Sequence, residues 1–121
     1  MWETATTDDF DHWFEQLDEA IQEEVAASVK LLQVYGPMLK RPHADTLNDS
    51  KHANMKELRV DELGAVIRIT FAFDPHRKAI LLVAGDKSGV NQKRFYRQLI
   101  AKADRLYDEH LERLKRQRKG S

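Results

Sequence analysis

The 121-residue sequence contains no cysteine, which excludes disulfide bonds, thiolate metal sites and cysteine nucleophiles. It also lacks any apolar run near the ~18 residues of a membrane-spanning helix, so we expect no membrane contact. The first residues, MWETATTDDFD, are acidic and lack the apolar core of a signal peptide. Absence of cysteine fits a reducing compartment, and a cytoplasmic location is therefore expected.

Common catalytic and metal-binding motifs are missing as well. The sequence has no HExxH, GxSxG, Walker A or GxGxxG segment. Its five histidines do not share metal-ligand spacing: His12, His43, His52, His76 and His110. We therefore expect no metal site and no cofactor, and we interpret His110, on an apolar helical stripe, as a packing residue.

Charge is unevenly distributed although the net charge is zero. Residues 1–35 carry nine acids and one base, a net charge of −8, and residues 36–121 carry the balancing +8. Such separation indicates one surface for a polyanion and another that avoids it or meets a basic partner. Solvation of ordinary exposed helices explains the same distribution equally well.

The N-terminal third predicts a short strand and two helices. MWETAT is typical of an edge strand. Apolar residues in steps of three and four predict helix over residues 8–35, with Thr7 or Asp8 capping its start and Asp18 capping a second helix after a bend near 18–20. Residues 36–54 predict a long loop that is either a ligand contact or an ordinary connection, and its basic residues are Lys40, Arg41, His43, Lys51 and His52.

The remainder predicts three strands and a final helix. Alternation over residues 54–60 and 65–73, followed by the apolar run from 79, predicts an antiparallel meander. A helical stripe begins near Asn91. This order predicts one α+β domain over residues 1–119, with helices covering one face of the sheet. Gly120 and Ser121 are interpreted as a cloning remnant outside it.

Three cations interrupt the meander. If Ile67 and Ile69 face the helices, Arg68 faces the other way, and the same alternation turns Arg59 to that side. With Lys87 after the last strand, they form either a phosphate site on an open sheet face or three solvated cations. Glu57 is interpreted as a surface partner of lysine or arginine, and Tyr96 as either a base-stacking or a packing residue.

An ordered set of segments resembles a known family. NMKELR, RITFAFDPHRKAILLVAGDK, KRFY and ADRLYDEHL, preceded by GPMLKRPHADTL, resemble the HigB branch of the RelE toxin superfamily, and more narrowly its phage-derived, host-killing-type members. The resemblance spans residues 10–112. It implies a RelE-like fold, in which an antiparallel sheet carries an N-terminal helical hairpin and a C-terminal helix.

The resemblance also implies a function. Such proteins are toxins of type II toxin–antitoxin pairs, and this one is expected to be an endoribonuclease that cleaves mRNA on the ribosome and inhibits translation and growth. The expected partner is a HigA-like helix-turn-helix antitoxin, through which alone operator DNA is bound. The residues implied are catalytic Arg59, Arg68, Lys87 and Tyr96, and RNA-binding Lys51, Lys56, Lys93 and Arg94.

Within this set, strand alternation favours Arg59 over Lys56 for the sheet face of Arg68. Metal-free cleavage would use Arg68 to stabilise the phosphate, and a lysine with a lowered pKa could serve as base. Two other interpretations remain: a non-catalytic RNA- or protein-binding module using the same basic face, and a structural or assembly protein of phage origin. The effect of substituting Arg59, Arg68 or Lys87 discriminates among the nuclease, the binding module and the structural protein.

Overall fold

Five strands and three α-helices follow one another in this computed structural model, which describes residues 1–120. In chain order they are β1 (Thr4–Thr6), α1 (Asp8–Glu15), α2 (Glu19–Tyr35), a 3-10 turn η1 (Gly36–Met38), β2 (Ala44–Thr46), β3 (Lys56–Glu62), β4 (Ala65–Phe73), β5 (Ala79–Asp86) and α3 (Gln92–Gly120). Gly120 is the last residue of α3, and Ser121 lies outside the described residues.

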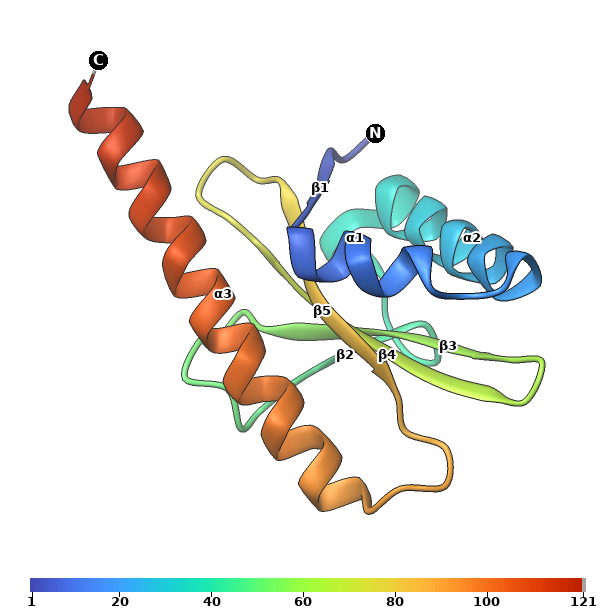
Figure 1. Cartoon of the computed structure of the whole chain (residues 1–121). Coiled ribbons are helices and arrows are strands. Elements are labelled where there is room, and N and C mark those ends of the chain that lie inside the picture. The colour runs from blue at the N-terminus through green and yellow to red at the C-terminus, as the bar shows by residue number, and fades with distance from the viewer. Residues whose placement is uncertain (121) are drawn as a thin grey trace.

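The strands form one sheet in the order β1–β5–β4–β3–β2 (Figure 1). Its centre is the predicted antiparallel meander of β3, β4 and β5. At one edge β1 pairs parallel with β5, so the sheet is mixed and not purely antiparallel as the sequence suggested. At the other edge β2 pairs antiparallel with β3. This strand lies inside the segment predicted as a loop, and its three residues are too few to show an alternation.

The predicted helical hairpin is confirmed and covers one face of the sheet. Thr7 Oγ1 accepts a hydrogen bond from the Phe10 amide at 3.0 Å, and Asp18 Oδ1 accepts one from the Ile21 amide at 3.0 Å, so each helix begins at a side-chain cap. The amphipathic helices bury their apolar sides against the sheet. The principal core residues on this face are Phe10, Val25, Leu32, Leu58, Val60, Ile67, Ile69, Phe71, Ala79 and Leu81.

Helix α3 covers the opposite face, so the prediction that all helices share one face is wrong. Figure 1 shows it crossing the sheet on the other side from α1 and α2 and extending past the sheet at its C-terminal end. The sheet has apolar residues on this face too, and burying both faces removes more apolar surface from water. The core residues of this second layer include Ala72, Ile80, Leu82, Val83, Leu99, Ile100, Ala103 and Leu106.

A β-bulge in β5 reverses the alternation of that strand. Ile69 pairs with Ala84 and Phe71 with Leu81, so Leu82 and Val83 together oppose Thr70. Both Leu82 and Val83 contribute to the core under α3. Beyond the bulge every side chain faces opposite to where an unbroken alternation would put it.

The bulge is closed by a buried hydroxyl. Thr70 Oγ1 donates to the Val83 carbonyl at 2.8 Å and accepts from the Val83 amide at 3.2 Å. These bonds satisfy backbone groups that the interrupted ladder leaves without strand partners.

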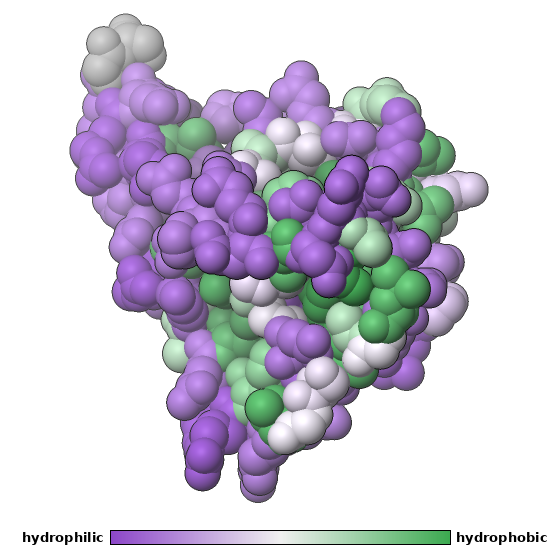
Figure 2. Space-filling view, turned by 45° about the vertical axis from the view of Figure 1, so that its right-hand side comes forward, coloured by the Kyte–Doolittle hydropathy of each residue, from purple (hydrophilic) through white to green (hydrophobic). Residues whose placement is uncertain are grey.

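The surface is largely hydrophilic. Figure 2 shows a hydrophilic band across the middle of the view, at the height of the acidic helix α1, with apolar surface beneath it. Among residues 1–120, no helix combines the length and the apolar character that a membrane crossing requires.

Replacing Thr70 with valine is expected to destabilise the fold by about 1–3 kcal/mol, because the Val83 amide and carbonyl would then be buried without partners. Urea unfolding of wild type and Thr70→Val measures the loss. Thr70→Ser is the matched control, since it keeps the hydroxyl and removes only a methyl group. Equal losses in the two variants would contradict a hydrogen-bonding role for Thr70.

Candidate functional site: a charged cluster beneath the start of helix α3

The register of the sheet brings two of the predicted cations together. Arg59 on β3 stands directly opposite Arg68 on β4. Both residues alternate with the neighbours that pack against α1 and α2, so their side chains lie on the α3 face. The alternation of β3 and β4 therefore predicted the correct face for both arginines.

That face is not open at Arg68. The residue is only 1% exposed and is the largest fully buried side chain among the described residues. The expectation of a solvent-facing arginine fails because the N-terminal part of α3 lies over it. Tyr96, on the first turns of α3, accepts a hydrogen bond from Arg68 Nε at 3.2 Å through its hydroxyl.

Carboxylates complete the surroundings of Arg68. Its Nη1 donates to Asp61 Oδ1 at 2.5 Å and to the Ile67 carbonyl at 2.8 Å. Its Nε lies 3.7 Å from Glu57 Oε1. A buried guanidinium requires this compensation, because removing a charge from water costs several kcal/mol when it has no partner. The Asp61 side chain is itself 53% exposed, so the ion pair reaches the surface on that side.

Glu57 is the second centre of the cluster. It is 5% exposed, which corrects the interpretation of Glu57 as a surface partner. Its Oε1 accepts from the Tyr96 hydroxyl at 2.8 Å, and its Oε2 lies 3.8 Å from Arg59 Nη1. The Tyr96 hydroxyl thus joins an arginine to a glutamate, which gives this tyrosine a bonding role beyond packing.

Lys87 joins the cluster from the end of β5. Gly85 pairs with Arg68, so the position of Gly85 lies on the α3 face of the sheet, and Lys87, two residues later, lies on that face as well. Without the bulge in β5, both positions would lie on the opposite face. Its Nζ stands 5.3 Å from the centre of the Tyr96 ring, within the range of a cation–π contact. The same atom donates to Gln92 Oε1 at 3.5 Å. Lys87 is partly exposed, so solvent reaches this side of the cluster.

The groups influence one another's protonation. Burial, with the positive charge of Arg68 as the next cause, lowers the pKa of Lys87 below its ordinary value. Burial and then the neighbouring Glu57 raise the pKa of the Tyr96 phenol. Burial acts to lower the pKa of Arg68, but hydrogen bonds to Asp61 and Tyr96 outweigh it and the net pKa is raised. Lys87 therefore holds its proton less firmly than an ordinary lysine, whereas Arg68 holds its proton more firmly than an ordinary arginine.

The other predicted RNA contacts are only partly near this cluster. Lys93 and Arg94 are exposed on the first turn of α3, beside Tyr96. Lys56 pairs with Phe71, which packs against α2, so Lys56 lies on the sheet face opposite the cluster. Lys51 forms an ion pair with Asp108, which is twelve residues, about 18 Å of helix, beyond Tyr96.

The long basic loop mainly holds β2 and β3 to the middle of α3. Ser50 Oγ donates to Asp104 Oδ1 at 2.5 Å, and His52 Nε2 lies 2.8 Å from Asp108 Oδ1. His110 pairs with Asp74 at 2.9 Å, which confirms it as a satisfied packing residue. Within residues 1–120, no three His, Asp or Glu side chains are grouped as a metal site would require.

Asp61 was missed from sequence, and Glu57 was predicted only as a surface partner of lysine or arginine and not as a buried member of the cluster. Glu57 and Asp61 share a strand face with Arg59, because they stand two residues to either side of it. An acid–base–acid alternation opposite an arginine on the next strand is a cross-strand charge pattern. That signal was available once Arg59 and Arg68 had been placed on one face.

Arg68→Ala is expected to destabilise the fold by about 3–5 kcal/mol, because Glu57 would keep a buried charge without its closest compensating cation. Chemical unfolding of Arg68→Ala, Glu57→Gln and the double variant measures the coupling. The double variant should lose less than the sum of the two single losses. Additive losses would show that Arg68 and Glu57 do not stabilise each other.

Comparison with known proteins identifies the family to which the chain is similar. Residues 12–108 match the family described as phage derived protein Gp49-like (DUF891). Two proteins of Mycobacterium tuberculosis are similar. "Putative toxin HigB2" is 42% identical over 109 residues, which cover 89% of this chain and 54% of that protein. "Putative toxin HigB3" is 49% identical over 94 residues, which cover 78% of this chain and 80% of that protein.

The chain thus spans about half the length of the first relative and about four-fifths of the second. Its mixed sheet, N-terminal hairpin and C-terminal helix make an α+β fold consistent with RelE-like toxins. The chain therefore belongs to the phage-derived Gp49-like family, in the HigB branch of the RelE toxin superfamily.

Proposed function

We propose that this chain is the toxin of a type II toxin–antitoxin pair, an endoribonuclease that cleaves mRNA on the ribosome without a metal ion and thereby inhibits translation and growth. The observation that carries the proposal is the convergence of Arg59, Lys87 and Tyr96 around buried Arg68, in a chain whose relatives are named as toxins. Cations surrounding a tyrosine suit a ribose–phosphate chain, whose phosphate is anionic and whose bases stack on aromatic rings.

Cleavage needs three things from such a cluster. The 2′-hydroxyl attacks the adjacent phosphorus and loses its proton, while the bond from phosphorus to the 5′-oxygen breaks and that oxygen takes up a proton from solvent water. The products are a 2′,3′-cyclic phosphate and a 5′-hydroxyl. The protein must hold the attacking oxygen in line, neutralise charge on the phosphoryl oxygens, and accept the first proton.

Lys87 is the proposed general base. Only its neutral form accepts a proton, and burial near Arg68 favours that form. Its ammonium form, produced by the transfer, also adds positive charge beside the phosphate. Arg59 is proposed to contact the phosphoryl oxygens from the neighbouring strand, and the 23% exposure of its side chain supports this role.

Arg68 is better suited to positioning than to direct contact. Its Nη1 and Nε are already engaged by Asp61, the Ile67 carbonyl and Tyr96. After burial, its positive charge is the next cause of the lowered pKa of Lys87, and it fixes the Tyr96 hydroxyl between two charged groups. Lys93 and Arg94, exposed at the start of α3, are proposed as further RNA phosphate contacts.

The remaining parts of the proposal concern partners and location. The chain is proposed to act in the cytoplasm with a HigA-like helix-turn-helix antitoxin, and operator DNA is reached only through that partner. The acidic helices α1 and α2 lie on the sheet face opposite the cluster. An anionic ribosome is therefore best met from the α3 side.

A binding module is the rival function, and one observation favours it. Arg68 has a full set of partners within the fold, as a purely structural arginine would. A module that grips RNA without cutting it loses affinity in small steps as single cations are removed, with a strong dependence on salt. A catalytic cluster loses cleavage with one substitution while binding largely survives.

Inducible expression in a bacterial host tests the proposal. Wild type is expected to arrest growth and create new RNA 5′ ends inside translated frames, and Lys87→Ala to lose both because the base is gone. Arg116→Ala, an exposed cation far along α3, is the matched control and should behave as wild type. Soluble wild-type protein that neither arrests growth nor produces new ends would exclude the nuclease and favour the binding module.

Cleavage should also depend on pH through Lys87. Because burial and the charge of Arg68 lower the pKa of Lys87 below the ordinary value of 10.5 and the neutral form is active, the single-turnover rate should rise as the pH is raised from about 6 toward 10, and level off at a lower pH than an ordinary lysine would require. Ribosome-bound mRNA and purified protein provide the assay. Lys87→Arg cannot deprotonate in this range, so its residual rate should be low and flat; a rising profile in that variant would assign the base elsewhere.

A further inference from the structure

A groove beside the cluster extends beyond the residues to which the proposed reaction gives a role. It has a volume of about 990 Å³ and runs between the N-terminal half of α3 and residues 46–49, the end of β2 and the turn after it. Glu57 and Tyr96, both members of the cluster, line it as well. The groove is therefore continuous with the place where the phosphate is proposed to bind.

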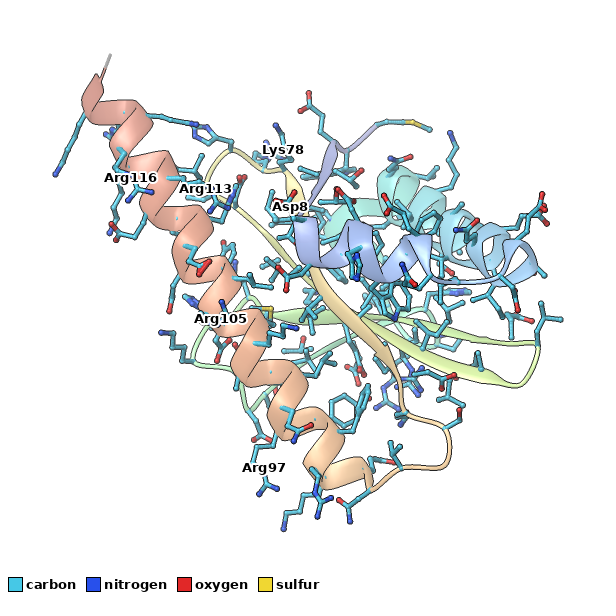
Figure 3. All side chains as sticks on the ribbon, viewed as in Figure 1. Asp8, Lys78, Arg97, Arg105, Arg113 and Arg116 are labelled. Atoms are coloured by element: carbon cyan, nitrogen blue, oxygen red, sulfur yellow. The ribbon has the colours of Figure 1, made fainter. Side chains whose placement is uncertain are left out.

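The walls of the groove differ in chemistry. Apolar groups of Leu47 and Ile100 form part of its lining. On the α3 side stand Lys93 and Arg97, which are four residues apart and so occupy one face of the helix. On the opposite side Asn48 and Asp49 present an amide and a carboxylate from an exposed turn. Figure 3 shows Arg97 beside the start of α3, away from the sheet.

These features match one nucleotide of single-stranded RNA. A flat base needs an apolar surface or a ring to rest on, and its edge needs hydrogen-bonding groups. Its phosphate needs a cation at the rim. A pocket of about 300–1,000 Å³ is the usual size for a ligand as large as a nucleotide. Because Asp49 and Asp104 also line the groove, the phosphate is expected at the rim beside Lys93 and Arg97 and the base in the interior.

We propose that this groove binds a nucleotide flanking the cleaved phosphodiester, with Lys93 and Arg97 holding its phosphate and Asn48 and Asp49 reading its base edge. The inference rests on the proposed ribonuclease function and adds to it the source of nucleotide preference. A carboxylate accepts hydrogen bonds only, so Asp49 favours a base whose edge offers N–H donors. The amide of Asn48 supplies both a donor and an acceptor at the adjoining position.

Mapping of RNA 5′ ends after expression tests the groove. Asp49→Ala is expected to keep growth arrest but lose about five- to tenfold of the nucleotide preference next to the cut, because one base-reading group is gone. Arg97→Ala is expected to lower cleavage about three- to tenfold at every site, because it removes a phosphate contact and not a base contact. Arg113→Ala, an arginine on the same helix beyond the groove, is the matched control and should leave rate and preference unchanged.

The outcomes separate the two proposals. Absence of cutting by soluble wild type refutes the nuclease itself. Cutting by wild type, with Asp49→Ala and Arg97→Ala indistinguishable from Arg113→Ala, overturns the groove assignment and leaves the nuclease standing. If Arg97→Ala cuts normally but escapes neutralisation by the co-expressed antitoxin, the groove is a protein-docking site and the assignment to RNA is wrong. Thermal unfolding confirms that each surface variant is folded.

Discussion

A buried arginine must be surrounded by groups that replace water, and the arrangement around Arg68 follows from that constraint. Asp61 and Glu57 supply negative charge from β3, and Tyr96 supplies a hydroxyl from α3. No side-chain nitrogen or oxygen that is buried within residues 1–120 lacks a hydrogen-bond partner. Since these partners come from separate elements, the charge requirement links the register of β3 and β4 to the position of the last helix.

The sheet also separates the charges of the molecule. Acidic helices α1 and α2 pack on one face, and α3, with a basic last turn and exposed cations along its length, packs on the other. A zero net charge therefore coexists with an acidic helical layer and a basic one, which meet where Asp9 of α1 pairs with Lys102 of α3 at 3.5 Å. A polyanion approaching from the α3 side meets the cluster without passing the acidic helices, which reconciles an overall neutral chain with RNA as the proposed substrate.

Patterns visible in single elements were sufficient to predict much of the fold, whereas features set by tertiary packing were not. The caps at Thr7 and Asp18 and the alternation of β3 and β4 identified the hairpin, the meander and the face of both arginines. The bulge in β5 could not be predicted because residues 79–84 are all apolar, so no alternation shows where two successive side chains share a face. The burial of Arg68 was equally hidden, since it depends on α3, whose choice of sheet face is not encoded in β4.

Burial by tertiary packing also determines which residues of the candidate site can contact a ligand. Groups that are fully bonded inside the fold, Arg68 above all, can set fields and geometry but cannot exchange partners without breaking the network. Arg59 and Lys87 keep partial exposure and weaker internal contacts, so they can meet a phosphate at little cost. Lys87 stands on this face only because the bulge reverses β5, and the bulge is closed by the hydroxyl of Thr70. A backbone irregularity in the core thus determines which lysine is available for chemistry at the surface.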